Sequence, residues 1–173
     1  MEDRKNTTVA FTGHRSYEGQ SNEELAILLE ELYVRGYRRF LTGMAWGFDL
    51  AAGEAVMALK YRHENVEMIA VEPYAAFREL FHDTDAERYD RIKATADEVV
   101  AVSQIGNRHS YLRRNDYLVD NASVLIAWWD SQPNSGTAYT VKRAKKKALE
   151  VHNLCKAESI TPLFEGLFGN LEF

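Results

Sequence analysis

The sequence predicts an α/β fold, a Rossmann-like three-layer sandwich with a mainly parallel sheet. Short runs rich in β-branched residues alternate along the chain with longer helical patterns, the order expected of strand–helix–strand units. The strand runs are continuously apolar, as in strands that helices cover on both faces. With 173 residues, 46% of them hydrophobic, the chain is expected to form a single domain over residues 1–173.

Six segments are expected to be strands. They cover residues 7–12, 38–43, 66–73, 98–102, 123–129 and 150–154. The fifth, "SVLIAWW", is the most apolar, and Pro73 ends the third because proline interrupts a strand's hydrogen bonding. Since successive side chains of a strand point to opposite faces, we expect Trp128 and Trp129 on opposite sides of the sheet.

The segments between these strands carry helical patterns. In "SNEELAILLEELYVRG" (21–36) leucines recur at helical spacing, Ser21 and Glu24 match a capping box, and Gly36 is a helix terminator. The other helical segments are "DLAAGEAVMALKYR" (49–62), an amphipathic region around 75–97, "RRNDYLVDNA" (113–122) and "TAYTVKRAKKKAL" (137–149). The third of these helices is expected to open at Arg113.

Composition narrows the classes of function. The formal net charge is −5, which argues against a generic nucleic-acid binder, whose affinity would come from phosphate neutralisation. The one cysteine, Cys155, excludes an intrachain disulfide and a thiolate zinc site, and it fits a reducing cytosol. There is no signal-peptide pattern and no run of about 18 apolar residues. A cytoplasmic protein without a membrane segment is therefore expected.

The core of the domain is expected at about 7–154, followed by an apolar tail at 156–173. The tail contains "ITPLFEGLFGNLEF", which is too apolar to remain in solvent. We expect it to pack on its own domain or on a partner subunit. The second case would make the protein a homo-oligomer.

Three strand ends carry loops rich in glycine, serine and threonine, and each loop leads into a helix. The loops are "FTGHRSYEGQS", "LTGMAWGFD" and "WDSQPNSGTAYT". In a parallel sheet, ligands bind beyond the carboxyl ends of the strands, where helix starts and close backbone amides attract anions. The three loops therefore predict an anion pocket if they converge, whereas the alternative is that the glycines serve only to form turns.

Four motifs resemble the SLOG superfamily, specifically its YpsA-like branch. They are "FTGHR", "TGMAWGFDLAAGEAV", "RRNDYLVDNASVLIAWWD" and "SGT" followed by a helix, and they span about residues 7–152. The superfamily also includes the DNA-processing protein A and the LOG enzymes. The resemblance implies a Rossmann-like domain that binds a nucleotide or a nucleotide-derived ligand.

Residue by residue, the resemblance and the loop positions give a predicted ligand-binding set. It comprises Thr12, Gly13, His14, Arg15, Gly43, Trp46, Gly47, Asp49, Arg114, Asn115, Asp130, Ser135, Gly136 and Thr137. Arg15 can offer a forked donor to a phosphate, and the amides at 13–15 and 135–137 are expected to line the anion. Asp49 either accepts from a ribose hydroxyl or caps its helix. Trp46 either stacks on a base or packs in the protein.

Two positions depart from the family pattern. Ser135 replaces the first glycine of a common pair, and Thr140 stands where the LOG enzymes place a glutamate. The second departure speaks against nucleotide phosphoribohydrolase chemistry. Catalytic residues are not assigned, although Glu72 is a candidate general base at a strand end.

Other polar residues point to no metal or cofactor. His63, His82 and His152 show no metal-ligand spacing and are expected on the surface or in packing, while His109 lies in a polar loop with a weaker functional claim. No metal site is expected beyond Mg²⁺ arriving with a phosphate ligand. The basic run "KRAKKK" (142–147) cannot share one helix face, and it lies where cations offset the helix dipole.

We interpret the sequence as a cytoplasmic binder of a nucleotide-like small molecule with a sensing or regulatory output. Two alternatives stay open. One is a hydrolase of N-glycosidic or phosphate bonds with Glu72, Asp49 or His14 as acid or base. The other is a single-stranded DNA binder, which the acidic net charge disfavours.

Overall fold

The β-branched runs form six parallel strands of one sheet. The computed structural model describes residues 2–156. Its strands are β1 (Thr8–Gly13), β2 (Arg39–Thr42), β3 (Glu67–Glu72), β4 (Glu98–Ala101), β5 (Val124–Trp128) and β6 (Glu150–Asn153). All neighbouring strands pair in parallel, which confirms the predicted Rossmann-like class.

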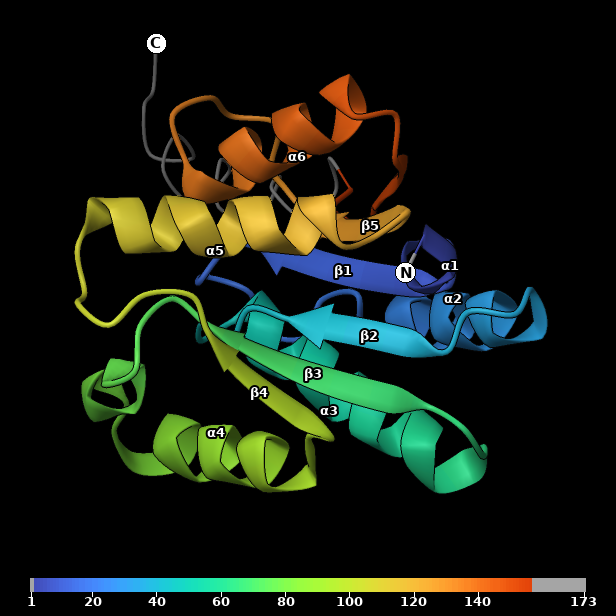
Figure 1. The fold of residues 1–173 in the computed structure, drawn as a ribbon. Helices are drawn as coiled ribbons and strands as arrows, with labels where there is room; N and C mark the ends of the chain where they lie inside the picture. The colour runs from blue at the N-terminus through green and yellow to red at the C-terminus, as the bar shows by residue number, and fades with distance from the viewer. Residues whose placement is uncertain (1, 157–173) are drawn as a thin grey trace, which may run out of the picture.

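The strand order is β4-β3-β2-β1-β5-β6 (Figure 1). The chain builds the sheet outward from β1 to β4 and then crosses back to place β5 on the other side of β1. The order therefore reverses between β1 and β5. This reversal is the topological switch point, where open parallel sheets form ligand crevices.

Helices cover both faces of the sheet (Figure 1). They are α1 (Glu2–Lys5), α2 (Asn22–Val34), α3 (Phe48–Arg62), the 3-10 helix η1 (Phe77–Leu80), α4 (Asp83–Thr95), α5 (Arg108–Asp120) and α6 (Gly136–Lys146). Helices α2, α3 and α4 contribute to one buried cluster, and α5 and α6 contribute to the other. The three layers follow from this division.

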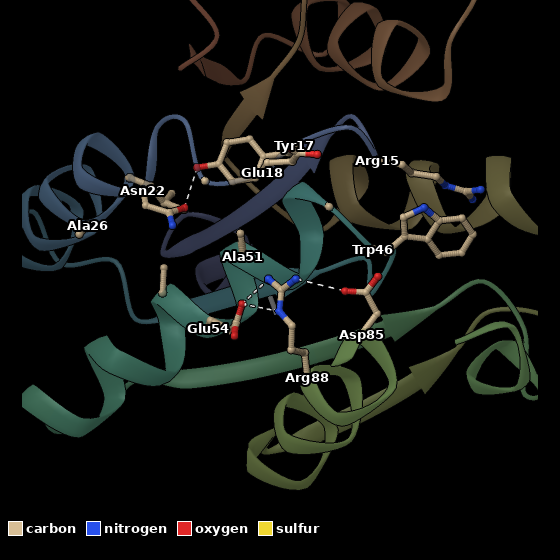
Figure 2. Close-up of a pocket in the computed structure, with 14 residues that line it drawn as sticks. Arg15, Tyr17, Glu18, Asn22, Ala26, Trp46, Ala51, Glu54, Asp85 and Arg88 are labelled. Atoms are coloured by element: carbon tan, nitrogen blue, oxygen red, sulfur yellow. Dashed lines mark hydrogen bonds and ion pairs between the residues drawn. The ribbon is translucent and has the colours of Figure 1, made fainter. Parts of the chain in front are cut away.

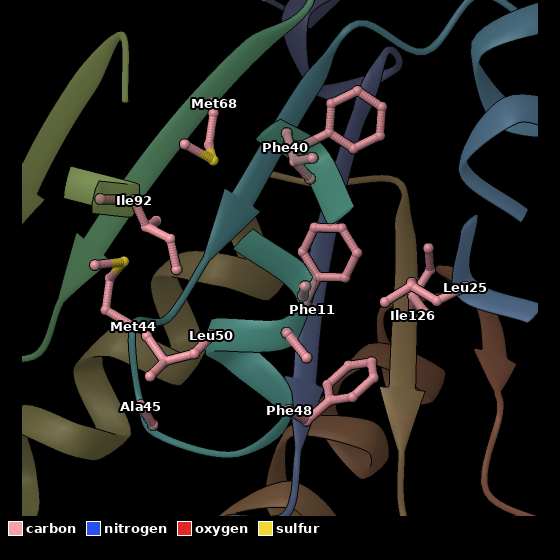
Figure 3. Close-up of a cluster of buried hydrophobic side chains, with 14 of the residues drawn as sticks. Phe11, Leu25, Phe40, Met44, Ala45, Phe48, Leu50, Met68, Ile92 and Ile126 are labelled. Atoms are coloured by element: carbon pink, nitrogen blue, oxygen red, sulfur yellow. The ribbon is translucent and has the colours of Figure 1, made fainter. Parts of the chain in front are cut away.

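Side-chain alternation assigns the strand residues to the two clusters. Val9 and Phe11 of β1 lie in the larger cluster, which Figure 3 shows in part, whereas Ala10 between them lies in the smaller one. Trp128 packs into the larger cluster and Trp129 against the smaller one, as predicted. Full burial on both faces explains why the strand runs are continuously apolar.

One predicted capping box and one predicted helix start are wrong, although Ser21 does occupy the N-cap position of α2. Ser21 makes no capping hydrogen bond, because its hydroxyl donates instead to the Leu154 carbonyl at 3.1 Å. Helix α5 begins at Arg108 and not at Arg113, because Asn107 and Ser110 form a capping box one and a half turns earlier. The helix end at Gly36 is confirmed, with a φ of 102° after the last turn of α2.

The predicted packing of the tail lies almost wholly on residues outside the described range. Lys156, the last described residue, pairs with Glu24 at 3.0 Å. Among residues 2–156, no helix is long and apolar enough to cross a membrane.

Candidate functional site

The loops after β2, β1 and β5 meet at one edge of the sheet because these three strands are neighbours. Between them lies a hollow of about 520 Å³, here called the switch-point hollow. Its lining includes most of the predicted set: Thr12, Gly13, His14, Arg15, Asp49, Arg114, Asn115, Asp130, Ser135, Gly136 and Thr137. Ser16, Ala45 and Tyr111 complete the lining.

Helix α6 points its N-terminus at the switch-point hollow. The Ser135 hydroxyl accepts from the Ala138 amide at 3.0 Å and so caps the helix. Gly136 and Thr137, the first two helical residues, have no carbonyl within the helix to which their N–H groups can donate. These two amides and the positive end of the helix dipole form an anion-attracting wall.

The first loop contributes fewer amides than predicted. The His14 amide donates to the Trp128 carbonyl at 3.3 Å and so extends the β1–β5 ladder. It is therefore not available to an anion, which corrects the prediction for this one amide of the segment 13–15. Gly13, His14 and Arg15 all line the hollow.

Arg114 and Asn115 lie in the middle of α5 and are both buried. The Arg114 guanidinium donates to the Gly43 carbonyl and, through Nε, to Asn115 Oδ1 at 2.8 Å. With Oδ1 engaged, the Asn115 amide nitrogen is left as a donor. That nitrogen lies beside Gly136 at the start of α6. Asn115 therefore adds side-chain N–H groups to the anion wall.

Asp49 is the acceptor of the switch-point hollow. It is the second residue of α3, whose N-cap is Gly47, so it is not the helix cap. Its Oδ2 accepts from the Ala45 amide at 3.2 Å, whereas its buried Oδ1 has no partner among the described residues. Burial raises the pKa of Asp49 to about 6, although the Arg114 charge, the Ala45 amide and Arg15 act in the opposite direction. Burial also lowers the pKa of Arg114.

His14 and Asp130 form a second polar pair in the hollow. His14 Nε2 lies 3.0 Å from Asp130 Oδ1 and 3.1 Å from the Asp130 backbone nitrogen. A protonated His14 donates to the carboxylate, and the neutral ring with Nε2 free accepts from the amide. The pair joins the end of β1 to the end of β5 across the switch point.

Two predicted glycines do not line the hollow. A Cβ on Gly43 would stand 2.8 Å from Asp49 Oδ2 and 3.0 Å from Arg114 Nη1, so this glycine makes room for the buried charges. Gly47 has a φ of 80°, and a Cβ there would stand 2.6 Å from the carbonyls of His14 and Arg15. These glycines therefore allow close packing of the second loop.

Arg15 separates the hollow from a flanking pocket. Its guanidinium lies 4.0 Å from the ring centroid of Trp46 and 5.7 Å from that of Tyr111. Trp46 lines the flanking pocket of about 680 Å³ between α2, α3 and α4, where Arg88 bridges Glu54 and Asp85 (Figure 2). Trp46 thus packs against Arg15 and does not itself line the hollow.

Sequence reasoning missed Tyr111. The ring lines the hollow, and it precedes Arg114 and Asn115 by three and four residues on α5. Residues at these spacings share one helix face, so the helical periodicity of "SYLRRN" could have revealed it. The misplaced helix start concealed this signal.

Glu72 stands outside the hollow. Its buried carboxylate accepts from the Tyr89 hydroxyl at 2.5 Å and pairs with Lys93 at 2.7 Å. Both contacts involve Oε1 and come from side chains of α4, and Glu72 does not line the hollow, so it is not placed to act as a general base there. Thr140 is also buried, and its hydroxyl donates to the Gly136 carbonyl at 2.7 Å.

Of the four histidines outside the hollow, two form pairs with glutamates and two do not line the hollow. His63 pairs with Glu30 at 2.6 Å, and His152 pairs with Glu150 at 2.8 Å. His82 immediately precedes α4, and His109 is exposed. Within residues 2–156, no three histidine, cysteine, aspartate or glutamate side chains are arranged to hold a metal ion.

The fold and the hollow define a Rossmann-like α/β protein with a polar site at the switch point of its sheet. The chain belongs to the YspA SLOG family, whose model matches residues 9–161. This match confirms the resemblance to the SLOG superfamily.

The chain also has sequence relatives in Bacillus. The chain is 28% identical over 140 residues to an uncharacterized SPbeta prophage-derived protein, YoqJ, of Bacillus subtilis (strain 168), covering 73% of this chain and 81% of the relative. It is 23% identical to a UPF0398 protein of Bacillus thuringiensis (strain Al Hakam), covering 84% and 85%.

The fold is similar to that of DNA processing protein A. The Streptococcus pneumoniae structure aligns with a TM-score of 0.62 and 17% identity over 98% of this chain, which spans 63% of that protein. The Helicobacter pylori protein, whose structure concerns its single-stranded DNA binding mode, aligns with a TM-score of 0.60 and 16% identity, covering 94% and 74%. At these identities the likeness shows the fold alone.

Proposed function

We propose that the protein binds a nucleotide or a nucleotide-derived ligand in the switch-point hollow, with a sensing or regulatory output in the cytoplasm. The observation that carries the proposal is the unpartnered Oδ1 of Asp49, a buried carboxylate oxygen of a hollow that is also lined by the donors of Arg15, Asn115 and the start of α6, and by the Asp130 carboxylate paired with His14. A buried acceptor without a partner is costly, so a ligand hydroxyl that donates to it gains affinity.

The donors opposite Asp49 suit the phosphate of the same ligand. The amides of Gly136 and Thr137, the Asn115 side chain and the Arg15 guanidinium all face this space. No carboxylate within residues 2–156 forms an ion pair with Arg15, so its charge is available to an anion. A nucleotide carries both a phosphate, which these donors can bind, and sugar hydroxyls, which can donate to Asp49.

The test is a thermal-shift titration with AMP, ADP, ADP-ribose, NAD and cyclic nucleotides. We expect at least one of them to raise the melting temperature, and Arg15→Ala to weaken its binding by at least tenfold. The matched control is Arg91→Ala, which removes an exposed arginine of α4 far from the hollow. Failure of every nucleotide to stabilise the protein at millimolar concentration would contradict the proposal.

A hydrolase acting in the same hollow is the second candidate. It is favoured by the pKa of Asp49, about 6, because carboxyl groups with raised pKa values are suited to acid–base catalysis near neutral pH. Glu72 does not support it, since this residue lies outside the hollow. Incubation with nucleoside monophosphates followed by chromatography for free base or phosphate tests it, and Asp49→Asn should abolish any release observed.

A further inference from the structure

A second space adjoins the switch-point hollow around the first turn of α6. This α5–α6 groove has a volume of about 850 Å³. It shares Tyr111, Asn115, Ser135 and Gly136 with the lining of the hollow. A ligand seated in the hollow can therefore continue into the groove without leaving the protein surface.

The groove is positively charged in an acidic protein. Arg108, Lys142 and Lys145 line it, and none of its lining residues is acidic. The whole chain has a net charge of −5, so this concentration of cations is local. A cleft lined by one sign of charge raises the local concentration of ligands of the opposite sign.

The basic run of α6 divides its cations between two faces. Arg143 and Lys147 pair with Asp120 of α5 at 3.0 and 3.3 Å. Lys142 and Lys145 form no ion pair within residues 2–156, and both face the groove. Of the five charges in the run, two thus stabilise the α5–α6 contact, two are available to a ligand in the groove, and Lys146 is exposed outside the groove.

Aromatic side chains accompany these cations. Trp129 and Tyr139 line the groove together with Tyr111. The Trp129 indole N–H donates to the Gln132 carbonyl at 2.9 Å, and Lys145 Nζ lies 5.8 Å from its ring centroid. A fixed aromatic ring beside a cation suits a nucleobase followed by a phosphate, because the base can stack while the phosphate pairs.

We propose that the groove accepts the second half of a dinucleotide-sized ligand, whose first nucleotide occupies the switch-point hollow. This inference rests on the proposed function of the hollow. The first phosphate contacts the start of α6, and the second nucleotide extends along α6 so that its phosphate meets Lys142 and Lys145. The groove then sets the preference for a ligand longer than a mononucleotide.

The experiment compares AMP with the linear dinucleotide pApA by isothermal titration calorimetry. We expect pApA to bind at least tenfold more tightly than AMP in low salt, with a smaller ratio in high salt. The double variant Lys142→Glu/Lys145→Glu should remove this advantage and leave AMP affinity within twofold. Lys146→Glu, an exposed charge of the same helix outside the groove, should change neither affinity.

The outcomes separate the two proposals. If AMP binds and pApA binds no more tightly, or if the double variant keeps the full advantage, the groove proposal is overturned and the hollow remains a nucleotide site. If neither ligand binds, the groove proposal is overturned, and the thermal-shift series with the other nucleotides decides whether the hollow is a nucleotide site. If a single-stranded decanucleotide binds at least tenfold more tightly than pApA, the groove is part of a nucleic-acid surface and the dinucleotide proposal is wrong. Melting curves of the variants verify that they are folded.

Discussion

At the scale of single residues, the buried charges around Asp49 decide what the hollow can hold. Asp49 and Arg114 are both buried, and Gly43 lies between them because a larger residue would displace the pair. A carboxylate with one unpartnered oxygen is held beside a guanidinium that is occupied by protein acceptors. The hollow is therefore lined by a buried carboxylate with one unpartnered oxygen, by the His14–Asp130 pair and by the donors of Arg15, Asn115 and the start of α6.

The pKa of Asp49 predicts a pH dependence of stability. The folded-state pKa of about 6 lies above the ordinary value of 3.8, so between these pH values the native state holds a proton that the unfolded chain has lost. The free energy of unfolding should therefore fall as pH rises from about 4 to about 6, by on the order of 3 kcal/mol from this group. Denaturant unfolding of the wild type and Asp49→Asn over this range measures the effect, which the variant should lack.

Asp90→Asn is the control for this titration. Asp90 is exposed, and its pKa is lowered by the hydrogen bond from Arg78, so its contribution to stability is lost only below its ordinary pKa. This variant should retain the wild-type decline between pH 4 and 6. Equal pH profiles for the wild type and Asp49→Asn would show that Asp49 does not titrate in this range.

Two glycines with positive φ, Gly47 and Gly36, should differ in how much an alanine substitution destabilises the protein. Gly47→Ala places a Cβ 2.6 Å from two backbone carbonyls, whereas Gly36→Ala, at a φ of 102°, meets nothing within 4 Å. Gly36→Ala should cost about 1 kcal/mol for the left-handed backbone, and Gly47→Ala at least about 2 kcal/mol more because the two loops must separate. Urea denaturation measures both, and equal losses would mean that the loops are not in close contact.

At the scale of elements, α5 and α6 build the site in different ways. Helix α6 directs its N-terminus at the hollow, so its contribution is backbone N–H groups and a dipole. Helix α5 passes beside the hollow, so its contribution is the side chains of one face: Tyr111, Arg114 and Asn115. The start of α5 is fixed by the Asn107–Ser110 capping box, seven residues before Arg114.

Removing this cap should loosen α5 without touching the hollow. Asn107→Ala removes the side-chain acceptor of the Ser110 amide and leaves it only the Asn107 carbonyl at 3.1 Å, so we expect a loss of about 1 kcal/mol in the free energy of unfolding. Asn107→Asp keeps a carboxylate oxygen at the cap and should remain within about 0.5 kcal/mol of the wild type. Chemical denaturation of both variants checks this expectation, and a full loss in the aspartate variant would contradict the capping role.

At the scale of the whole molecule, the order of the strands determines where the hollow lies and how burial varies across the sheet. The central strands β1, β2 and β5 are buried on both faces, whereas most residues of β4 and β6 at the sheet edges are exposed or half-buried. Placement of the reversal beside β1 puts the hollow at the most buried part of the sheet. The loops that form the hollow therefore extend from the most buried strands of the sheet.

The decrease in burial from the central strands to the edge strands predicts the pattern of native-state hydrogen exchange. Amides of β1 and β5 should exchange only through global unfolding, and those of β4 and β6 should exchange through local opening of lower free energy. Mass spectrometry of exchanged peptides at increasing denaturant distinguishes the two classes. Protection of β4 equal to that of β1 would show that the sheet opens as one unit.

Local sequence patterns determined the fold class and the approximate position of every strand, and the family resemblance together with the loop positions predicted most of the residues that line the hollow. Apolar runs and helical periodicity depend on neighbouring residues, so they can be recognised along the chain, as "SVLIAWW" and the segment 21–36 show. The strand order, the bond from Ser21 to Leu154, the burial of Glu72 and the α5–α6 groove required the tertiary structure. Each of these joins residues far apart in sequence, and the competition between a local cap and a distant acceptor has no signature in either segment alone.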